Sequence, residues 1–153
     1  MSRKLILCSD GTGNSGGKLR GTNVWRFYKA LDNNPKYQQI SFYQDGVGAQ
    51  DFKLLRMLGG AFGYGLSANI REMYTFLVEN YQPGDNIYLL GFSRGAFTVR
   101  AFAYMLTVCG VIKAANDPKE TEQRISEAMK HYHQWRSDIR KTAKDEIKQP
   151  SLS

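Results

Sequence analysis

Ser93 stands in the segment Gly91-Phe92-Ser93-Arg94-Gly95, which has the Gly-x-Ser-x-Gly spacing of a serine nucleophile. The spacing is typical of a sharp strand-to-helix turn, where side chains at the two glycine positions would collide with neighbouring elements. A hydroxyl at that turn lies at the N-terminus of the helix, where negative charge is favoured. The segment therefore predicts Ser93 as a catalytic nucleophile and the backbone N–H of Arg94 as an oxyanion donor. The alternative is a plain turn in which Ser93 only caps the helix.

A second glycine-rich loop, Asp-Gly-Thr-Gly-Asn at residues 10–14, follows an apolar run near the N-terminus. Its glycine spacing does not match a nucleotide-binding phosphate loop. Glycine-rich backbone at a strand end can direct an N–H toward a neighbouring nucleophile, and the donor here would be Gly11 or Thr12. The alternative is a structural turn closed by the side chains of Asp10 and Asn14. Either interpretation makes these residues candidates for lining the site.

A serine nucleophile also needs a general base and an acid that orients it. Asp45 follows a predicted strand and either orients a base or forms a local turn with Gly46. The chain has two histidines, His131 and His133, two residues apart and so on different faces of a predicted terminal helix. Both are typical of surface histidines, so the sequence presents a nucleophile without an evident base.

Alternating strands and helices would position these groups. Strands are predicted over residues 4–8, 39–44 and 86–91, and helices over 24–31, 70–81, 94–109 and from 116 onward. This order predicts an α/β fold with a parallel sheet between two helical layers, three layers in all. The strands' carboxyl ends should bring their loops together at one edge. The connection at 49–65 ends in a glycine-rich run that is either a mobile lid or a tight packing turn.

Composition indicates one ordinary globular domain. The 153 residues are 42% apolar and 23% charged, which predicts a single domain over 1–153 with a frayed tail at 149–153. Cys8 and Cys109 are predicted to be reduced, and with no leader-like segment a cytoplasmic location is expected. The net charge of +7 is dispersed, which suits solubility or a membrane surface with anionic lipids. We expect no nucleic-acid partner, no metal and no cofactor.

Four motifs together resemble one known family. The chain is similar to the DUF2235 group of α/β-hydrolase domains, which includes phospholipase effectors of bacterial type VI secretion. The resemblance implies a serine hydrolase of carboxylic esters, with phospholipids as substrates, Ser93 as nucleophile and export by type VI secretion. It rests on Ser-Asp-Gly-Thr-Gly-Asn at 9–14, Tyr-Gln-Asp-Gly-Val-Gly at 43–48, Gly-Gly-Ala-Phe-Gly-Tyr-Gly at 59–65 and Gly-Phe-Ser-Arg-Gly-Ala-Phe-Thr-Val-Arg at 91–100.

The sequence departs from the family pattern at its end. Family members continue into another strand with a Trp-Asp-Thr-Val-like segment and then a loop with the catalytic histidine, and neither is present before Ser153. The resemblance therefore implies the N-terminal part of an α/β-hydrolase domain, inactive by itself and completed by a missing C-terminal half or a complementary chain. The alternative is a non-catalytic remnant of the same fold, acting as a binding or assembly module.

Overall fold

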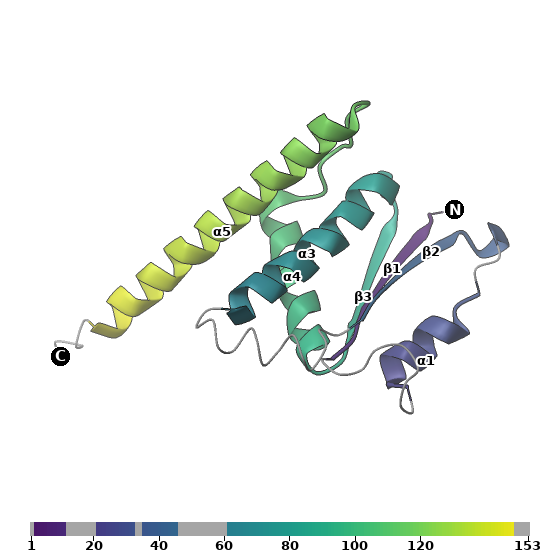
Figure 1. Cartoon of the computed structure of the whole chain (residues 1–153), viewed down its shortest axis with the longest axis horizontal. Coiled ribbons are helices and arrows are strands. Elements are labelled where there is room, and N and C mark those ends of the chain that lie inside the picture. The colour runs from purple at the N-terminus through teal and green to yellow at the C-terminus, as the bar shows by residue number, and fades with distance from the viewer. Residues whose placement is uncertain (1, 12–20, 33–34, 46–60, 149–153) are drawn as a thin grey trace.

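The computed structural model describes residues 2–11, 21–32, 35–45 and 61–148 (Figure 1). Strands and helices alternate along these ranges, which confirms the predicted α/β order. None of the helices described is both long and apolar enough to cross a membrane. The elements are β1 (Lys4–Ser9), α1 (Asn23–Ala30), the short 3-10 helix η1 (Pro35–Tyr37), β2 (Gln39–Gln44), α3 (Ala61–Asn80), β3 (Asn86–Gly91), α4 (Arg94–Cys109) and α5 (Pro118–Lys148).

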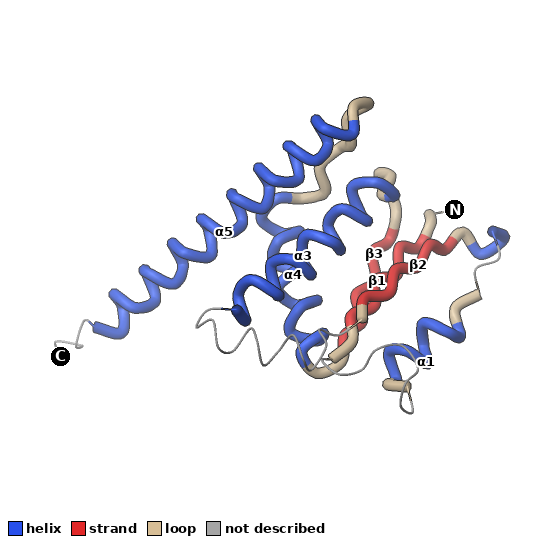
Figure 2. Tube along the Cα trace, viewed as in Figure 1, coloured by secondary structure: helices blue, strands red, loops and turns tan. Residues whose placement is uncertain are grey.

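The strands form a parallel sheet in the order β2-β1-β3, with β1 in the centre (Figure 2). The register pairs Lys4 of β1 with the first residue of each neighbouring strand. At the other end, Ser9 lies opposite both Gln44 and Gly91. The carboxyl ends of the three strands therefore lie together at one edge of the sheet, as predicted, and the end of β1 lies between those of β2 and β3.

Helices cover both faces of the central strand, as its alternating side chains require. Leu5 and Leu7 point into a large core shared with α3, α4 and α5. Ile6 and Cys8 point to the opposite face, where Val24 of α1 packs against them. The molecule thus has the three predicted layers, with α1 on one side of the sheet and α3, α4 and α5 on the other.

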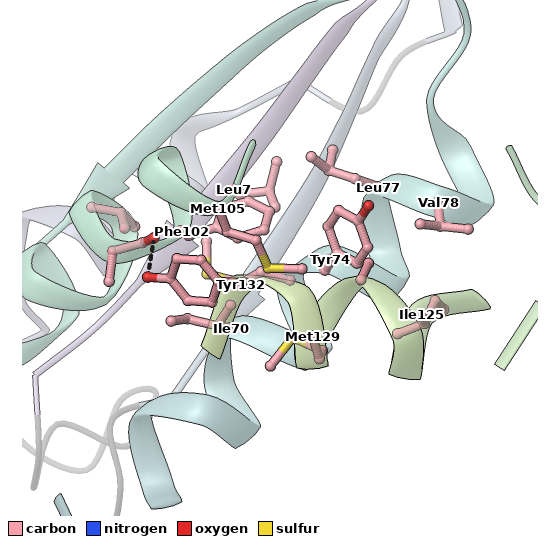
Figure 3. Packing of buried hydrophobic residues seen from close by; sticks show 14 of the residues in the cluster. Leu7, Ile70, Tyr74, Leu77, Val78, Phe102, Met105, Ile125, Met129 and Tyr132 are labelled. Carbon is pink, nitrogen blue, oxygen red and sulfur yellow. Dashed lines mark hydrogen bonds between the residues drawn. The ribbon is translucent and has the colours of Figure 1, made fainter. Parts of the chain in front are cut away.

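One buried aromatic residue in the large core connects α5 to α4. Tyr132 of α5 is 1% exposed, and its hydroxyl donates a hydrogen bond of 2.8 Å to the carbonyl of Ala101 in α4 (Figure 3). Met129 and Ile125, one and two turns earlier in α5, are also buried. Ile139 lies past this contact and is 49% exposed, because α5 continues beyond the layer that it covers.

The long connection predicted over 49–65 is shorter than expected, because α3 already begins at Ala61. Residues 61–65 are helical, so this part of the glycine-rich run is neither a lid nor a packing turn. Each glycine inside a helix costs about 1 kcal/mol relative to alanine, which is why the sequence predicts a loop for the glycine-rich run. Packing of the following apolar stripe, which includes Leu66 and Ile70, outweighs that cost. Residues 46–60 lie outside the described ranges.

Candidate active site

Ser93 lies at the turn between β3 and α4 in a backbone conformation that L-residues rarely adopt. Its φ is 54° and its ψ is −121°, and α4 begins at the next residue. Although Ser93 occupies the N-cap position, its side chain makes no capping hydrogen bond, so the structure does not support the capping interpretation. The residue is exposed. The turn therefore holds an accessible hydroxyl at the N-terminal end of α4 in a strained backbone.

The two flanking glycines are required by the close approach of the backbone on both sides of the turn. A Cβ at Gly91 would lie 2.6 Å from the carbonyl oxygen of Gly95 and 2.6 Å from Cα of Ala96. A Cβ at Gly95 would lie 2.1 Å from the carbonyl oxygen of Ser9. The same Ser9 oxygen accepts a hydrogen bond of 3.1 Å from the N–H of Phe92. The steric reason predicted for both glycines is therefore confirmed, and the turn rests on the end of β1.

Replacing Ser93 by glycine is expected to stabilise the fold. Glycine has no Cβ and adopts a positive φ without the penalty of an L-residue, so Ser93→Gly should raise the free energy of unfolding by about 1 kcal/mol. Ser93→Ala keeps the Cβ and is the matched control, with an expected change within about 0.5 kcal/mol. Urea denaturation followed by circular dichroism measures both. Equal free energies of unfolding for the two variants would show that the backbone strain is not stored at this position.

Asp10 lies directly after β1 and ties the surrounding elements together. The residue is 3% exposed. Its Oδ2 accepts hydrogen bonds from the hydroxyl of Tyr43 in β2 at 2.7 Å and from the hydroxyl of Thr22 at 2.5 Å. Its Oδ1 accepts from the N–H of Gly11 at 2.8 Å. Thr22 in turn accepts a hydrogen bond from the N–H of Trp25 and caps α1.

The hydrogen bonds of Asp10 affect which backbone N–H groups can act as the expected oxyanion donors. The N–H of Gly11 donates to the Asp10 carboxylate, so in this conformation it already has an acceptor. Thr12 and Asn14 lie outside the described residues. Arg94 is the first residue of α4, in the turn whose N–H groups point out of the helix end. The side chain of Asp10 closes the turn after β1 through its bond to Gly11, which is the structural alternative predicted for this residue.

A second polar group at the strand ends was not identified from the sequence. Gln44 is 5% exposed, and its side-chain amide donates to a carboxylate oxygen of Glu72 and, at 3.3 Å, to the carbonyl of Asn69 in α3. The hydroxyl of Ser9 donates to the amide oxygen of Gln44 at 3.4 Å. A polar residue at the buried end of an apolar strand was the available signal. Its partners are distant in sequence, so the pattern did not reveal the network.

Asp45 lies just past β2 and is exposed. Its charge contributes, after burial and the hydrogen bond to Asp10, to raising the pKa of Tyr43 above its usual value. Asp45 is thus an acidic neighbour of Tyr43. Gly46, the partner in the predicted local turn, lies outside the described residues.

Alkaline pH is expected to destabilise the protein through the buried Cys8. Burial raises the pKa of this thiol from its ordinary 9.0 to about 11. Between these values the folded chain keeps a proton that the unfolded chain has lost, so stability is full below about pH 9 and declines as the pH rises. The loss from Cys8 should reach roughly 2 kcal/mol, and Tyr43, whose pKa burial also raises, adds to it at higher pH.

Urea denaturation of the wild type and of Cys8→Ala at a series of pH values measures this dependence. The variant has a lower stability throughout, because it leaves a cavity, but should lose less between about pH 9 and 11. Parallel curves for the two proteins would contradict the assignment to Cys8.

Both histidines lie on α5, beside a residue that packs against α4. His131 and His133 flank Tyr132, which contacts Ala101, eight residues into the chain from Ser93. At the rise of an α-helix, Ala101 lies about 12 Å along α4 from Ser93. Both histidines are largely exposed. Partial burial of the His133 ring, together with the charge of the neighbouring Arg136, lowers the pKa of His133. The surface interpretation made from the sequence agrees with these positions.

Similarity to known proteins shows which family the chain belongs to. The family model for the catalytic domain of Tle1-like phospholipase effectors of type VI secretion matches residues 3–152. The chain belongs to this family. An uncharacterized protein of Saccharomyces cerevisiae, YEL023C, is 33% identical over an alignment of 149 residues, and the match covers 89% of this chain and 21% of the yeast protein. No solved structure matches the chain.

Two consequences follow from these similarities. A member of the family is thus a relative of a yeast protein, so the family resemblance by itself does not indicate a bacterial source. The chain spans about a fifth of the length of the yeast relative.

Within the ranges that the structure describes, no group of three histidine, cysteine or acidic side chains is arranged to hold a metal ion.

Proposed function

We propose that this chain carries the nucleophile of a serine esterase that cleaves a carboxylic ester bond of a phospholipid. The observation that carries the proposal is the backbone of Ser93, held at φ 54° at the start of α4 with its hydroxyl free of any capping bond. Strained backbone at an exposed polar residue is typical of functional sites. The phospholipase family to which the chain belongs supports a lipid ester as the substrate class.

In the proposed reaction, Ser93 Oγ forms a bond to the ester carbonyl carbon while a base takes its proton. The carbonyl oxygen becomes an oxyanion, which the N–H of Arg94 and the dipole of α4 stabilise. Thr12 is the second proposed donor, because the N–H of Gly11 is bonded to Asp10. Collapse of the intermediate releases the alcohol, and water then hydrolyses the acyl-serine. Acid and base come from a C-terminal part or complementary chain.

The test compares this chain by itself with the chain co-expressed with the rest of the yeast relative, meaning the part of that protein outside its matched region. The substrates are a short-chain nitrophenyl ester and phosphatidylcholine vesicles. We expect near-background hydrolysis by the chain alone, because loss of the base of a triad lowers kcat on the order of a million-fold. The co-expressed pair should hydrolyse both substrates.

Ser93→Ala should abolish that activity, and Ser126→Ala on α5 is the matched control that should retain it. Activity that survives Ser93→Ala would contradict the proposed nucleophile. Absence of hydrolysis by an assembled pair would favour the non-catalytic module of the same fold. Robust hydrolysis by the chain alone would instead point to His131 or His133 as the base.

A further inference from the structure

One side of α4 is exposed, although the helix is apolar around most of its circumference. Phe97 is 46% and Tyr104 is 56% exposed, and Arg100 between them is exposed as well. Ser93 directly precedes the helix. Spacings of four, seven and eleven residues from Ser93 place these three side chains on one side of α4, in line with it. The exposed side of α4 therefore begins at the elbow.

The buried stripe of α5 continues past the layer that this helix covers. Trp135 and Ile139 follow Tyr132 at helical spacing, and α5 extends beyond α3 and α4 (Figure 1). The ring centroid of Trp135 lies 6.2 Å from that of Tyr132 and 6.4 Å from that of Tyr104 on α4. Tyr104 thus joins the exposed side of α4 to the stripe of α5. We call this surface the α4–α5 face, and it consists of Phe97, Arg100, Tyr104, Trp135, Arg136 and Ile139.

Positive charge is concentrated around the α4–α5 face. α4 has two arginines and no acidic residue, and residues 130–143 of α5 have four basic residues against one acid, so these two stretches hold five of the seven net charges. Residues 118–129 of α5 have instead two basic residues and three acids. Ion pairs engage Arg124 and Glu122 there, whereas among the described residues none engages Arg100 or the basic residues of 130–143. Folding therefore places aromatic side chains and excess positive charge together.

We propose that the α4–α5 face binds the surface of an anionic phospholipid membrane. Aromatic side chains favour the interface between lipid and water, and apolar stripes flanked by Lys and Arg bind in the plane of that interface. Anionic lipid attracts basic residues that lie within a Debye length of its surface. The choice of phospholipid as the partner rests on the proposed function. Because the face begins at Ser93, binding would bring the ester bonds of the membrane to the elbow.

Two other partners fit this face less well. A second copy of the chain would bring two faces of excess positive charge together, which opposes association. Nucleic acid supplies negative phosphates, but it has no hydrocarbon phase to cover the exposed aliphatic side chain of Ile139. A membrane surface meets both the charge and the apolar character of the face.

Sedimentation with vesicles tests the proposal. The vesicles consist of phosphatidylcholine alone or of phosphatidylcholine mixed equally with phosphatidylglycerol. The chain should bind the anionic vesicles about tenfold more tightly or better, and binding should weaken as the salt concentration rises.

Charge reversal on both helices provides the first variant. Arg100→Glu combined with Arg140→Glu should weaken binding to anionic vesicles by about tenfold or more. Arg26→Glu combined with Lys119→Glu is the matched control, because it changes the net charge equally at exposed positions outside the face. The control should weaken binding by less than about threefold. Circular dichroism verifies that both double variants are folded.

Removal of apolar surface provides the second variant. Ile139→Ser should weaken binding to anionic vesicles by about fivefold, since the isoleucine no longer enters the interface. Phe27→Ser on α1 is the matched control, because Phe27 is also exposed but lies on the other side of the sheet, and it should leave binding unchanged.

The two tryptophans report which side of the molecule meets the lipid. Trp25 lies on α1, across the sheet from α4. Vesicles with nitroxide-labelled acyl chains should quench the fluorescence of Trp135 in the Trp25→Phe variant by about twofold or more. In the Trp135→Phe variant, the fluorescence of Trp25 should change little.

Each of three results would overturn the proposal: no binding to anionic vesicles, equal effects of the two charge variants, or stronger quenching of Trp25 than of Trp135. Light scattering that shows a dimer, made monomeric by Ile139→Ser, would identify a second copy as the partner instead. Binding of an oligonucleotide, without binding of vesicles, would identify nucleic acid. Vesicle binding by a chain whose assembled pair hydrolyses no ester supports the membrane surface and counts only against the proposed function.

Discussion

Gly95→Ala is expected to lower the free energy of unfolding by roughly 3 kcal/mol, a large part of the stability of a domain of this size. The new Cβ would lie 2.1 Å from the carbonyl oxygen of Ser9, 2.5 Å from its carbonyl carbon and 2.8 Å from the carbonyl oxygen of Asp10. All these atoms are backbone, so no side-chain rotation relieves the contact. Relief requires that α4 move away from the end of β1, and the Ser93 turn would move with it.

Gly65→Ala is the matched control for this substitution. Gly65 lies within α3, and a Cβ there would meet no atom within 4 Å, so alanine should be neutral or stabilise the helix by up to about 1 kcal/mol. Urea denaturation of both variants measures the difference. Similar free energies of unfolding for Gly95→Ala and Gly65→Ala would mean that α4 does not approach β1 this closely.

Asp10→Ala is expected to cost about 3 kcal/mol, because it removes the acceptor of several buried donors at once. The hydroxyls of Tyr43 and Thr22 and the N–H of Gly11 would lose their partner in an environment where the replaced side chain was 3% exposed. Thr22 caps α1, so the loss should also loosen that helix on the sheet. Thermal unfolding, followed by the circular-dichroism signal of helices at 222 nm, and urea denaturation together measure the effect.

A double-mutant cycle with Tyr43→Phe assigns the effect to the hydrogen bond rather than to the loss of volume. Residues that share a hydrogen bond couple by roughly 0.5–3 kcal/mol, so the double variant should lose less than the sum of the single losses. Asp138→Ala on α5 is the matched surface control, because Asp138 is exposed, and should change stability by less than about 0.5 kcal/mol. Strict additivity of Asp10→Ala and Tyr43→Phe would contradict the proposed link between β1 and β2.

The local pattern determined most of the elements. Apolar runs predicted the three strands to within a residue, and the apolar segment at 94–109 predicted both ends of α4. Thr22, of a residue type that commonly caps helices, makes the capping hydrogen bond of α1 with its side chain. These features depend on neighbours along the chain, so their physical causes are present in short segments. The start of α3 was misplaced because packing of Leu66 and Ile70 overrode the low helix propensity of the preceding glycines.

The sequence by itself determined Ser93 as the candidate nucleophile and the need for Gly91 and Gly95. Only the tertiary structure decided how the site is held. In the folded chain, the N–H of Gly11 donates to the carboxylate of Asp10, and that carboxylate also accepts from the hydroxyl of Tyr43, which lies 33 residues away along the chain. The tertiary structure also left the outer edge of β3 uncovered within the described residues. Local geometry follows from residue type and spacing, whereas these partners depend on strand order and helix packing, which bring together residues that no sequence pattern relates.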